Sequence, residues 1–544
     1  MILDFVDKTS LFVLRVPRSE TDIRALMRDH GLDLSLPGST PSEAMLFTGD
    51  PYAACTFWSC ATPGARAALA PIQAQIDASW APSSGRHYRV PADMSLWPFQ
   101  AANLDYCLSR RNTLIADQPG LGKTPTAIAF CNEVRAKRVL VLCPANIRLQ
   151  WVKRIREWTT MQWPYGIHCI LTSRSGVHPT AAWTVTSYEM ARQPAIAKAL
   201  AKGHYDVLIL DEAHYLKTTD SLRTRSIFGG GKDRAWEPLA SRCERILALT
   251  GTPLPNRPRE AYTIAKALCW DAIDWQSEDS FKERYNPSAV REVVDRYGRV
   301  KKFIDERTGR HAELQNRLRA NFMVRHLKAD VLTQLPEVMH DVVQLEETGP
   351  VKQALKAESM LDIDPETLTA ADMTIMGHIS QVRHMMGVAL APQAADYVAG
   401  LLDGGEEKIL VFAHHLAVLD ILEEKLGRHG VARIDGGSSM NQRTKAVKDF
   451  REDPAIKVMV GNLQSMGTGT DGLQDVCSHS VFAECSWVHG ENQQGIDRLH
   501  RMGQQSGVLA EFLVAPGSIS EKVLANSLRK GQSVHKALDA GLIL

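Results

Sequence analysis

The sequence lacks the cysteine spacing of a metal-binding module. It has 10 cysteines in 544 residues, scattered without a C-x-x-C pair, and several of them lie within apolar runs. A thiol in such a run serves as a small hydrophobic side chain, and this spacing does not build a zinc site. The pattern argues against a zinc-finger module and indicates reduced thiols inside a cytosolic protein.

A targeting segment and a membrane-spanning segment are also missing from the pattern. The N-terminus has no basic stretch followed by an apolar core. No apolar run approaches the ~20 residues that are needed to cross a bilayer. We therefore expect a cytoplasmic protein that is neither exported nor embedded in a membrane.

The chain also has no excess of either positive or negative charge, since 63 Lys and Arg residues balance 62 Asp and Glu residues and leave a formal net charge of +1. Such a chain has no overall field that attracts a polyanion, so any anion-binding site must be a local patch. Charge alone neither favours nor excludes a nucleic acid as a partner.

What is present is an alternation of apolar strands and amphipathic helices, in a chain too long for one core. Residues 1–90 predict a small αβ domain with strands at Ser10–Val16 and Ala44–Thr48, each followed by a helical face. The break at Pro82–Gly85 marks its end. This domain either recognises a substrate or stabilises the chain as an appendage.

Two series of buried strands follow, in residues 91–275 and 346–515. Short apolar strands that alternate with helices are typical of parallel sheets covered on both faces. Residues 276–345 are rich in charge, helical in pattern and without buried strands, so we interpret them as a helical insertion. Residues 516–544 are expected to form a closing helix packed on the core. The expected strands are Thr113–Ala116, Val139–Cys143, Val207–Leu210, Ile246–Leu249, Ile409–Phe412, Val458–Gly461 and Ser480–Phe482. The predicted fold class is α/β, with two tandem parallel-sheet lobes.

The strongest local signal is ADQPGLGKT, residues 116–124, which lies between a buried strand and a helix. Gly120 and Gly122 let the backbone curl so that its N–H groups and the helix N-terminus face phosphate oxygens. Lys123 can then reach the β and γ phosphates, and Thr124 can bind Mg²⁺. Glycines followed by Lys-Thr at a strand-to-helix junction indicate a nucleotide site rather than an ordinary turn.

An acidic pair follows another apolar strand. Asp211 and Glu212 come at the end of Val207–Leu210, and α/β sheets build their sites at the carboxyl ends of strands. Asp211 would hold Mg²⁺, and Glu212 would orient and deprotonate the attacking water. By itself the pair is typical of a solvated turn; downstream of a phosphate loop, it predicts the second half of an ATP-hydrolysing site.

Two further segments complete the candidate site. Thr250, Gly251 and Thr252 follow a buried strand and form either a plain turn or a sensor that couples the γ-phosphate to nucleic-acid grip. In QGIDRLHRMGQ, Arg498 and Arg501 are spaced to share one helical face. Delivered from the second lobe, they would stabilise the transferring phosphoryl group when the lobes close. A solvated helix face is the alternative.

Taken in order, these segments resemble the Swi/Snf-type branch of superfamily two. The resemblance covers about residues 91–515 and implies two RecA-like lobes in an ATP-driven translocase on duplex or forked DNA. Within this branch, VFAHH and MVRHLKADVLTQLP (323–336) are most similar to the HepA-related, SMARCA-like annealing helicases, which rewind or remodel forks. The segments are LWPFQ (96–100), DQPGLGKT (117–124), DEAH (211–214), LTGTP (249–253), VFAHH (411–415), the Gly467-Thr468-Gly469 loop and DRLHRMGQ (497–504).

The resemblance also implies roles for single residues. Gln100 would read the adenine edge with Phe99 nearby, and Gln494 would be a further nucleotide contact. Thr186, Ser187 and the 467–469 loop would touch the DNA backbone, through contacts that carry no sequence information and depend on salt. Lys123, Thr124, Asp211 and Glu212 would hydrolyse ATP with Mg²⁺, and Arg498 and Arg501 would be the arginine fingers.

Some positions depart from the family's pattern. Asp117 takes the first glycine position of the phosphate loop, which helicase-type motors tolerate. Gln118 stands where Glu is common and should leave hydrolysis intact. His326 stands where a second Arg is usual, and the loop Met466–Asp471 is also unlike the family's, so both put in doubt the details of DNA grip and coupling.

Three functions remain open. The first is translocation on duplex or forked DNA with strand annealing or fork remodelling, and the second is strand unwinding or an RNA-directed motor. The third is a nucleotide-gated binding protein, a partner of polymerase or chromatin, that does not travel. The intact catalytic set favours the first. We expect a monomer, and the absence of a nuclease or chromatin-reader segment favours a bacterial or phage source.

Overall fold

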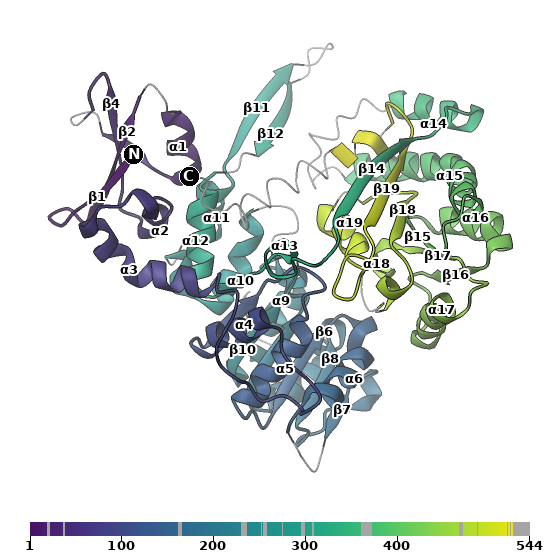
Figure 1. Cartoon of the computed structure of the whole chain (residues 1–544), viewed down its shortest axis with the longest axis horizontal. Coiled ribbons are helices and arrows are strands. Elements are labelled where there is room, and N and C mark those ends of the chain that lie inside the picture. The colour runs from purple at the N-terminus through teal and green to yellow at the C-terminus, as the bar shows by residue number, and fades with distance from the viewer. Residues whose placement is uncertain are drawn as a thin grey trace.

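In the residues that it describes, the computed structural model contains three main sheets and one hairpin (Figure 1). A four-stranded antiparallel sheet lies near the N-terminus, and two larger sheets, parallel throughout, form two lobes. This arrangement confirms the α/β fold with two parallel-sheet lobes and a small N-terminal αβ unit. The structure describes residues 1–18, 22–35, 39–161, 166–229, 237–251, 253, 258–274, 276–294, 300–306, 309–360, 373–466, 470, 472–486, 488–518, 520–522 and 524–525.

The N-terminal unit is a sheet of order β1-β2-β4-β3 with helices packed on it. In β2, Phe12, Leu14 and Val16 are buried at every second position, as in a strand with one face on a core. Helix α1 begins after Asp22, whose carboxylate accepts a hydrogen bond from Ala25 N at 3.0 Å. The elements are β1 (Ile2–Val6), β2 (Leu11–Pro17), α1 (Ile23–His30), β3 (Asp33–Ser35), β4 (Glu43–Thr48), α2 (Pro51–Cys55) and α3 (Pro63–Ala78).

The first lobe has seven parallel strands in the order β13-β5-β10-β9-β6-β8-β7. All residues of β6 are buried, because helices cover both faces of the sheet. Strand β10 pairs with β5 and β9 so that Leu249 lies level with Ile115 and Asp211, which brings the ends of three motif-bearing strands together. The four strands expected here are present. The elements are α4 (Pro98–Leu108), β5 (Asn112–Ile115), α5 (Lys123–Glu133), β6 (Val139–Cys143), α6 (Arg148–Trp158), β7 (Ile167–Cys169), β8 (Trp183–Ser187), α7 (Tyr188–Ala191), α8 (Pro194–Ala201), β9 (Tyr205–Asp211), α9 (Leu222–Phe228), β10 (Cys243–Leu249) and α10 (Ala261–Leu268).

The second lobe has six parallel strands in the order β14-β19-β18-β15-β17-β16. The three strands expected here are β15, β17 and β18, which are neighbours in the sheet and almost wholly buried. The elements are β14 (Val338–Gln344), α14 (Gly349–Met360), α15 (Met373–Asp403), β15 (Ile409–Ala413), α16 (Leu416–Leu426), β16 (Val431–Ile434), α17 (Met440–Glu452), β17 (Val458–Asn462), α18 (Leu463–Met466), β18 (His479–Phe482), α19 (His489–Ile496) and β19 (Val508–Val514).

Residues 276–345 differ from the expected helical insertion. Helices are present, but so are a hairpin and one edge strand for each lobe. Strand β13 consists only of the buried pair Met323–Val324, which is too short to give a periodic signal. Strand β14 is mostly exposed at the sheet edge and therefore lacks an apolar run. The domain limits at 90, 275, 345 and 515 stay predictions. The elements are α11 (Glu278–Tyr285), β11 (Ser288–Val294), β12 (Val300–Glu306), α12 (His311–Asn321), β13 (Met323–Val324) and α13 (Lys328–Val331).

The N-terminal unit packs on α12, beside α11, through buried charges (Figure 1). Arg317, which is 1% exposed, forms an ion pair with Asp50 of the unit. Arg284 Nη2 lies 2.7 Å from Asp50 Oδ2 and 2.8 Å from Glu313 Oε1. The Tyr285 hydroxyl donates to Glu313 Oε1 at 2.6 Å. Loss of one partner would leave an uncompensated buried charge, so the cluster fixes the unit to the first lobe.

The structure bears on two of the absences noted in the sequence. All ten cysteines are free, as their spacing indicated. Ile379–Asp403 of α15 is a 25-residue stretch that by length and composition alone could cross a bilayer, although Arg383 and Asp396 interrupt its apolar residues. Its Ala391, Ala394 and Val398 are buried in a core cluster of the second lobe, so its apolar character serves that core.

The predicted closing helix lies largely outside the described residues, which end at Ala525. Leu524 is buried and belongs to a core cluster of the second lobe. A helix over residues 516–544 therefore stays a prediction.

Candidate active site

The phosphate loop joins β5 to α5 with a backbone that its glycines permit. Gly120 and Gly122 have φ angles of 88° and 74°, in the left-handed region that favours glycine. Helix α5 begins at Lys123, so the N–H groups of its first turn open onto the loop. A Cβ at Gly120 would come within 2.7 Å of the Arg501 Cβ. The second lobe therefore lies directly against the loop.

Two departures from the family's pattern pair with each other inside the first lobe. The Asp117 carboxylate is fully buried and accepts hydrogen bonds from Asn103 Nδ2 at 2.6 Å and from His326 N at 2.9 Å. His326 Nδ1 lies 3.3 Å from the same carboxylate. Burial acts to raise the pKa of Asp117, but the interactions with His326 and the charge of Lys123 outweigh it and lower that pKa. The loop is thus tied to the segment that leads to the second lobe.

The Lys123 ammonium lies within the curl of its own loop. Its Nζ donates to Asp117 O at 2.8 Å and to Gln118 O at 3.3 Å. Burial lowers the pKa of Lys123, although Glu212 and other nearby carboxylates oppose this effect. A phosphate oxygen is a stronger acceptor for an ammonium than these carbonyls. The ammonium is therefore placed to exchange them for an anion.

The buried Asp211 carboxylate is held by an indole that the sequence motifs did not indicate. Trp151 Nε1 donates to Asp211 Oδ2 at 2.7 Å, and Glu212 N donates to Oδ1 at 2.9 Å. Burial and then the negative charge of Glu212 raise the pKa of Asp211. A nearby cation would favour its ionised form, which is the form that Mg²⁺ binds.

Glu212 is connected through His214 to Thr250, which follows strand β10. Its φ of 51° is unusual for a residue other than glycine, and such strain gathers at functional sites. Glu212 Oε2 lies 3.1 Å from His214 Nδ1, which lies 3.1 Å from Thr250 Oγ1. Burial acts to raise the pKa of Glu212, but the hydrogen bond and charge of His214 and the charges of Lys123 and Arg498 outweigh it and lower that pKa.

Gly251, the residue after Thr250, lies against the phosphate loop. A Cβ at Gly251 would come within 2.6 Å of the Pro119 ring. Thr250 and Gly251 therefore connect the acidic pair to the loop, as a sensor requires, while Thr252 lies outside the described residues. Their role as a sensor stays a prediction.

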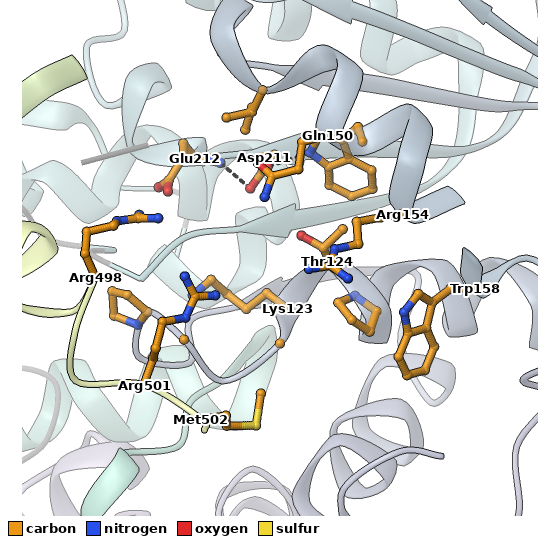
Figure 2. Close-up of a pocket in the computed structure, with 16 residues that line it drawn as sticks. Lys123, Thr124, Gln150, Arg154, Trp158, Asp211, Glu212, Arg498, Arg501 and Met502 are labelled. Atoms are coloured by element: carbon orange, nitrogen blue, oxygen red, sulfur yellow. Dashed lines mark hydrogen bonds between the residues drawn. The ribbon is translucent and has the colours of Figure 1, made fainter. Parts of the chain in front are cut away.

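Arg498 and Arg501 enter the same cleft from the second lobe, on the side of Lys123 opposite Thr124 (Figure 2). The expectation that they share a helical face is wrong, because α19 ends at Ile496 and both arginines lie in the turns that follow. The chain there forms short-range bonds, such as Arg498 N to Gly495 O at 3.1 Å. Both side chains line the cleft, but they extend from the turns after α19 and not from one face of a helix.

A buried lysine joins the two sides of the cleft. Lys328 Nζ donates to Asp497 Oδ1 at 2.6 Å and to the His500 carbonyl, and both charged side chains are 4% exposed. Lys328 N donates to Gln118 Oε1 of the phosphate loop at 2.7 Å. Because Asp497 and His500 flank Arg498, this lysine holds the arginine segment against the loop.

The remaining wall of the cleft is formed mainly by α6, which motif analysis missed. Gln150, Arg154 and Trp158 recur every fourth residue and therefore share one helix face, while Trp151 lies between them. Two polar side chains and a tryptophan at this spacing, directly after a buried strand, are the signal that could have found them. The cleft has a volume of about 310 Å³, which suits a small-molecule ligand.

Three residues predicted to contact the nucleotide do not line this cleft in the described part of the chain. Phe99 is 1% exposed and packs with Leu121 and Leu332. Gln100 is buried behind the loop, where its Oε1 accepts from Trp97 N and its Nε2 donates to Leu121 O, both at 3.0 Å. Gln494 is also not among the lining residues. These roles stay predictions without support from this geometry.

The residues predicted to contact DNA are either buried or outside the described residues. Thr186 and Ser187 are buried at the end of β8, and Ser187 Oγ accepts from Met190 N at 3.2 Å, which caps α7. This geometry gives Ser187 a structural role. Gly467, Thr468 and Gly469 lie outside the described residues, so the predicted contact of all five with DNA stays a prediction.

The oxygen donors of the cleft suit Mg²⁺. Thr124 and Asp211 both line it, and hydroxyl and carboxylate oxygens are the ligands that this ion prefers. Among the described residues, no group of three or more His, Cys, Asp or Glu side chains could hold a metal. Mg²⁺ usually needs only one or two protein oxygens beside phosphates, so the donor set fits.

Comparison with known proteins agrees with this geometry. The chain matches the SNF2-related domain over residues 55–386 and the helicase conserved C-terminal domain over residues 393–503. It is 29% identical over 453 residues to the DNA annealing helicase and endonuclease ZRANB3 of Bos taurus, covering 82% of this chain and 40% of that protein.

Another curated relative and a solved structure are also similar. The SWI/SNF-related matrix-associated actin-dependent regulator of chromatin subfamily A-like protein 1 of Xenopus tropicalis is 29% identical over 445 residues, covering 78% of this chain and 43% of that protein. The chain thus spans less than half the length of either curated relative. The Sulfolobus solfataricus SWI2/SNF2 ATPase core in complex with dsDNA has 17% identity and a TM-score of 0.39, covering 84% of this chain and 99% of that one.

Proposed function

Because this chain belongs to the SNF2-related family and carries a helicase C-terminal domain, we propose that it hydrolyses ATP to move along duplex or forked DNA. One observation carries the proposal: Arg498 and Arg501 of the second lobe line the same cleft as Lys123 of the first. A cleft that needs both lobes links hydrolysis to their relative motion.

The residues of the cleft divide the chemistry between them. Lys123 and the α5 N-terminus bind the phosphates, Glu212 orients the attacking water and accepts its proton, and the two arginines stabilise charge on the transferring group. Thr124 and Asp211 would hold Mg²⁺, which when bound would supply positive charge that offsets the charge of the phosphates. The Glu212–His214–Thr250 chain carries the state of the site toward the rest of the first lobe.

Duplex or forked DNA is the proposed substrate, with annealing or fork remodelling as its outcome. The name of ZRANB3 describes an annealing helicase, which supports this choice for the shared core. We further propose that the protein acts as a monomer in the cytoplasm, and that residues 1–90 form an accessory domain fixed to the first lobe.

The test compares ATP hydrolysis with single-stranded, duplex and forked DNA and with RNA. We expect duplex or forked DNA to stimulate most, and Lys123→Ala to abolish stimulated hydrolysis, because the phosphates lose their ammonium. Lys198→Ala, which removes an exposed lysine of α8, is the matched control. Stimulation by RNA alone, or equal activity of Lys123→Ala and the parent, would overturn the proposal.

A second measurement separates movement from nucleotide-gated binding. Displacement of a third strand from a triplex requires travel along the duplex, whereas a binding switch leaves the triplex intact. We expect ATP-dependent displacement. Hydrolysis without displacement would establish the alternative of a nucleotide-gated binding protein.

A further inference from the structure

The cleft between the lobes has two chemically different ends. At one end lie the charged side chains of Lys123, Glu212, Arg498 and Arg501. At the other end lie Arg154 and Trp158 of α6, beyond Thr124 (Figure 2). A nucleoside triphosphate has the same polarity, with anionic phosphates at one end and a flat aromatic base at the other.

Helix α6 is built to present these side chains. Trp151 and Ile155 are buried, so one side of the helix is fixed in the core of the lobe. The face with Gln150, Arg154 and Trp158 spans about 12 Å at the usual rise per residue, which can carry a ligand from its phosphates to its base. Asn132 Nδ2 donates to Trp158 O at 2.9 Å, which fixes the end of the helix where the indole lies.

The residue expected to read the base, Gln100, is buried and does not line the cleft. Both ends of the Gln100 amide are bonded within the chain, to Trp97 N and to Leu121 O. To meet a base edge, Gln100 would have to give up bonds that hold the phosphate loop and leave its buried place. A different part of the cleft is therefore left for the base.

We propose that Trp158 and Arg154 form the base end of the nucleotide site, where the base of a nucleoside triphosphate stacks on the indole with the guanidinium beside it. This inference rests on the proposed function, because it assumes that the phosphates lie at Lys123. Stacking is available to every base, since each has a π-face. Stacking of the base therefore contributes to the affinity for the triphosphate and not to the rate of hydrolysis. The affinity for another purine triphosphate, such as GTP, also depends on Trp158.

The test separates the base from the phosphates by comparing ATP with inorganic tripolyphosphate as a competitor. We expect Trp158→Ala to raise the KM for ATP about tenfold, the size of one lost base stack, and to lower kcat much less. The inhibition constant of tripolyphosphate should stay the same, because this anion has no base. Trp158→Phe should restore most of the affinity.

Two variants control for damage to the fold. Trp158→Leu keeps an apolar side chain against the core but removes the aromatic face, so it should raise the KM as Trp158→Ala does, and it replaces that variant should Trp158→Ala fail to fold. Lys153→Ala, on the outer side of α6 with its side chain 74% exposed, should change neither constant.

The outcomes distinguish this inference from the proposed function. An unchanged KM for ATP in Trp158→Leu, with Lys123→Ala inactive, would overturn the base site and leave the ATPase intact. A parallel rise in the tripolyphosphate constant would also overturn it, because Trp158 would then support the phosphate loop. Full activity of Lys123→Ala would instead overturn the ATPase proposal.

Discussion

The two lobes share a fold but differ at their strand-to-helix turns. After β15 of the second lobe, the N–H groups of His414 and His415 donate to the Glu484 carboxylate at 2.8 and 2.9 Å. The other oxygen of Glu484 lies 2.7 Å from His415 Nδ1. The turn thus holds an anion supplied by the chain itself, from just after β18.

The turn after β5 of the first lobe is made differently. It is rich in glycine, its lysine points into the loop, and its one carboxylate, Asp117, is bonded to Asn103 and His326. In either lobe, the backbone N–H groups at the start of a helix can bind an anion. The two lobes therefore differ in where that anion comes from. One lobe is completed by its own glutamate and the other, on the proposed function, by a nucleotide.

The largest expected effect comes from the two arginines that the second lobe contributes to the cleft. We expect Arg498→Ala or Arg501→Ala to lower kcat for DNA-stimulated hydrolysis about a thousandfold, the scale of a lost arginine finger. Single-turnover hydrolysis at saturating ATP and DNA measures this loss. Arg428→Ala, whose side chain is 65% exposed on the second lobe, is the control. Variants as fast as the parent would show that the first lobe hydrolyses ATP alone and would break the comparison.

A smaller effect is expected at the internal anion. We expect Glu484→Gln to destabilise the protein by about 2 kcal/mol at neutral pH, because the charge that strengthens these hydrogen bonds is removed and one acceptor oxygen is replaced by N–H₂. Urea unfolding followed by circular dichroism measures it, with the exposed Glu452→Gln as the control.

The pH dependence of this effect has a definite sign. Burial acts to raise the pKa of Glu484, but the His415 hydrogen bond and charge and the two N–H donors outweigh it and hold the pKa below its ordinary 4.5. The stabilisation is therefore complete above pH 4.5 and is lost as the pH falls through the folded-state pKa. A difference between parent and variant that is equal at pH 7 and pH 4 would refute the role of the charge.

The sequence predicted the elements that repeat a pattern over several residues. Five-residue apolar strands such as Val139–Cys143 and the glycine-lysine loop were recovered, because burial on both faces and a left-handed backbone leave direct marks on residue type. The two-residue strand Met323–Val324 and the exposed edge strand Val338–Gln344 leave no such marks, since one is too short and the other lacks a buried face.

The candidate site shows the same limit. Lys123, Asp211 and the two arginines were found by motif and do line the cleft, whereas Trp151 and Lys328 act through contacts between distant segments. Family resemblance also assigned Gln100 to the base; this role stays a prediction, because the side chain is buried and bonded to Trp97 N and Leu121 O and does not line the cleft. Which partners a side chain meets is decided by tertiary packing, which spacing along the chain does not encode.

The smallest expected effect lies where Lys328 joins the phosphate loop to the arginine segment of the second lobe. Gln118 Oε1 accepts from Lys328 N at 2.7 Å, and Lys328 Nζ binds Asp497 beside the arginines. A carboxylate accepts the same bond, so we expect Gln118→Glu to change kcat by less than about twofold. Gln118→Leu removes the acceptor and leaves a buried N–H unpaired, and we expect it to lower kcat about tenfold by loosening the arginine segment. Steady-state hydrolysis of the pair is the measurement. Equal activity of both variants would mean that Lys328 holds the arginines without help from the loop, and a large loss in Gln118→Glu would mean that the amide N–H₂ has a role of its own.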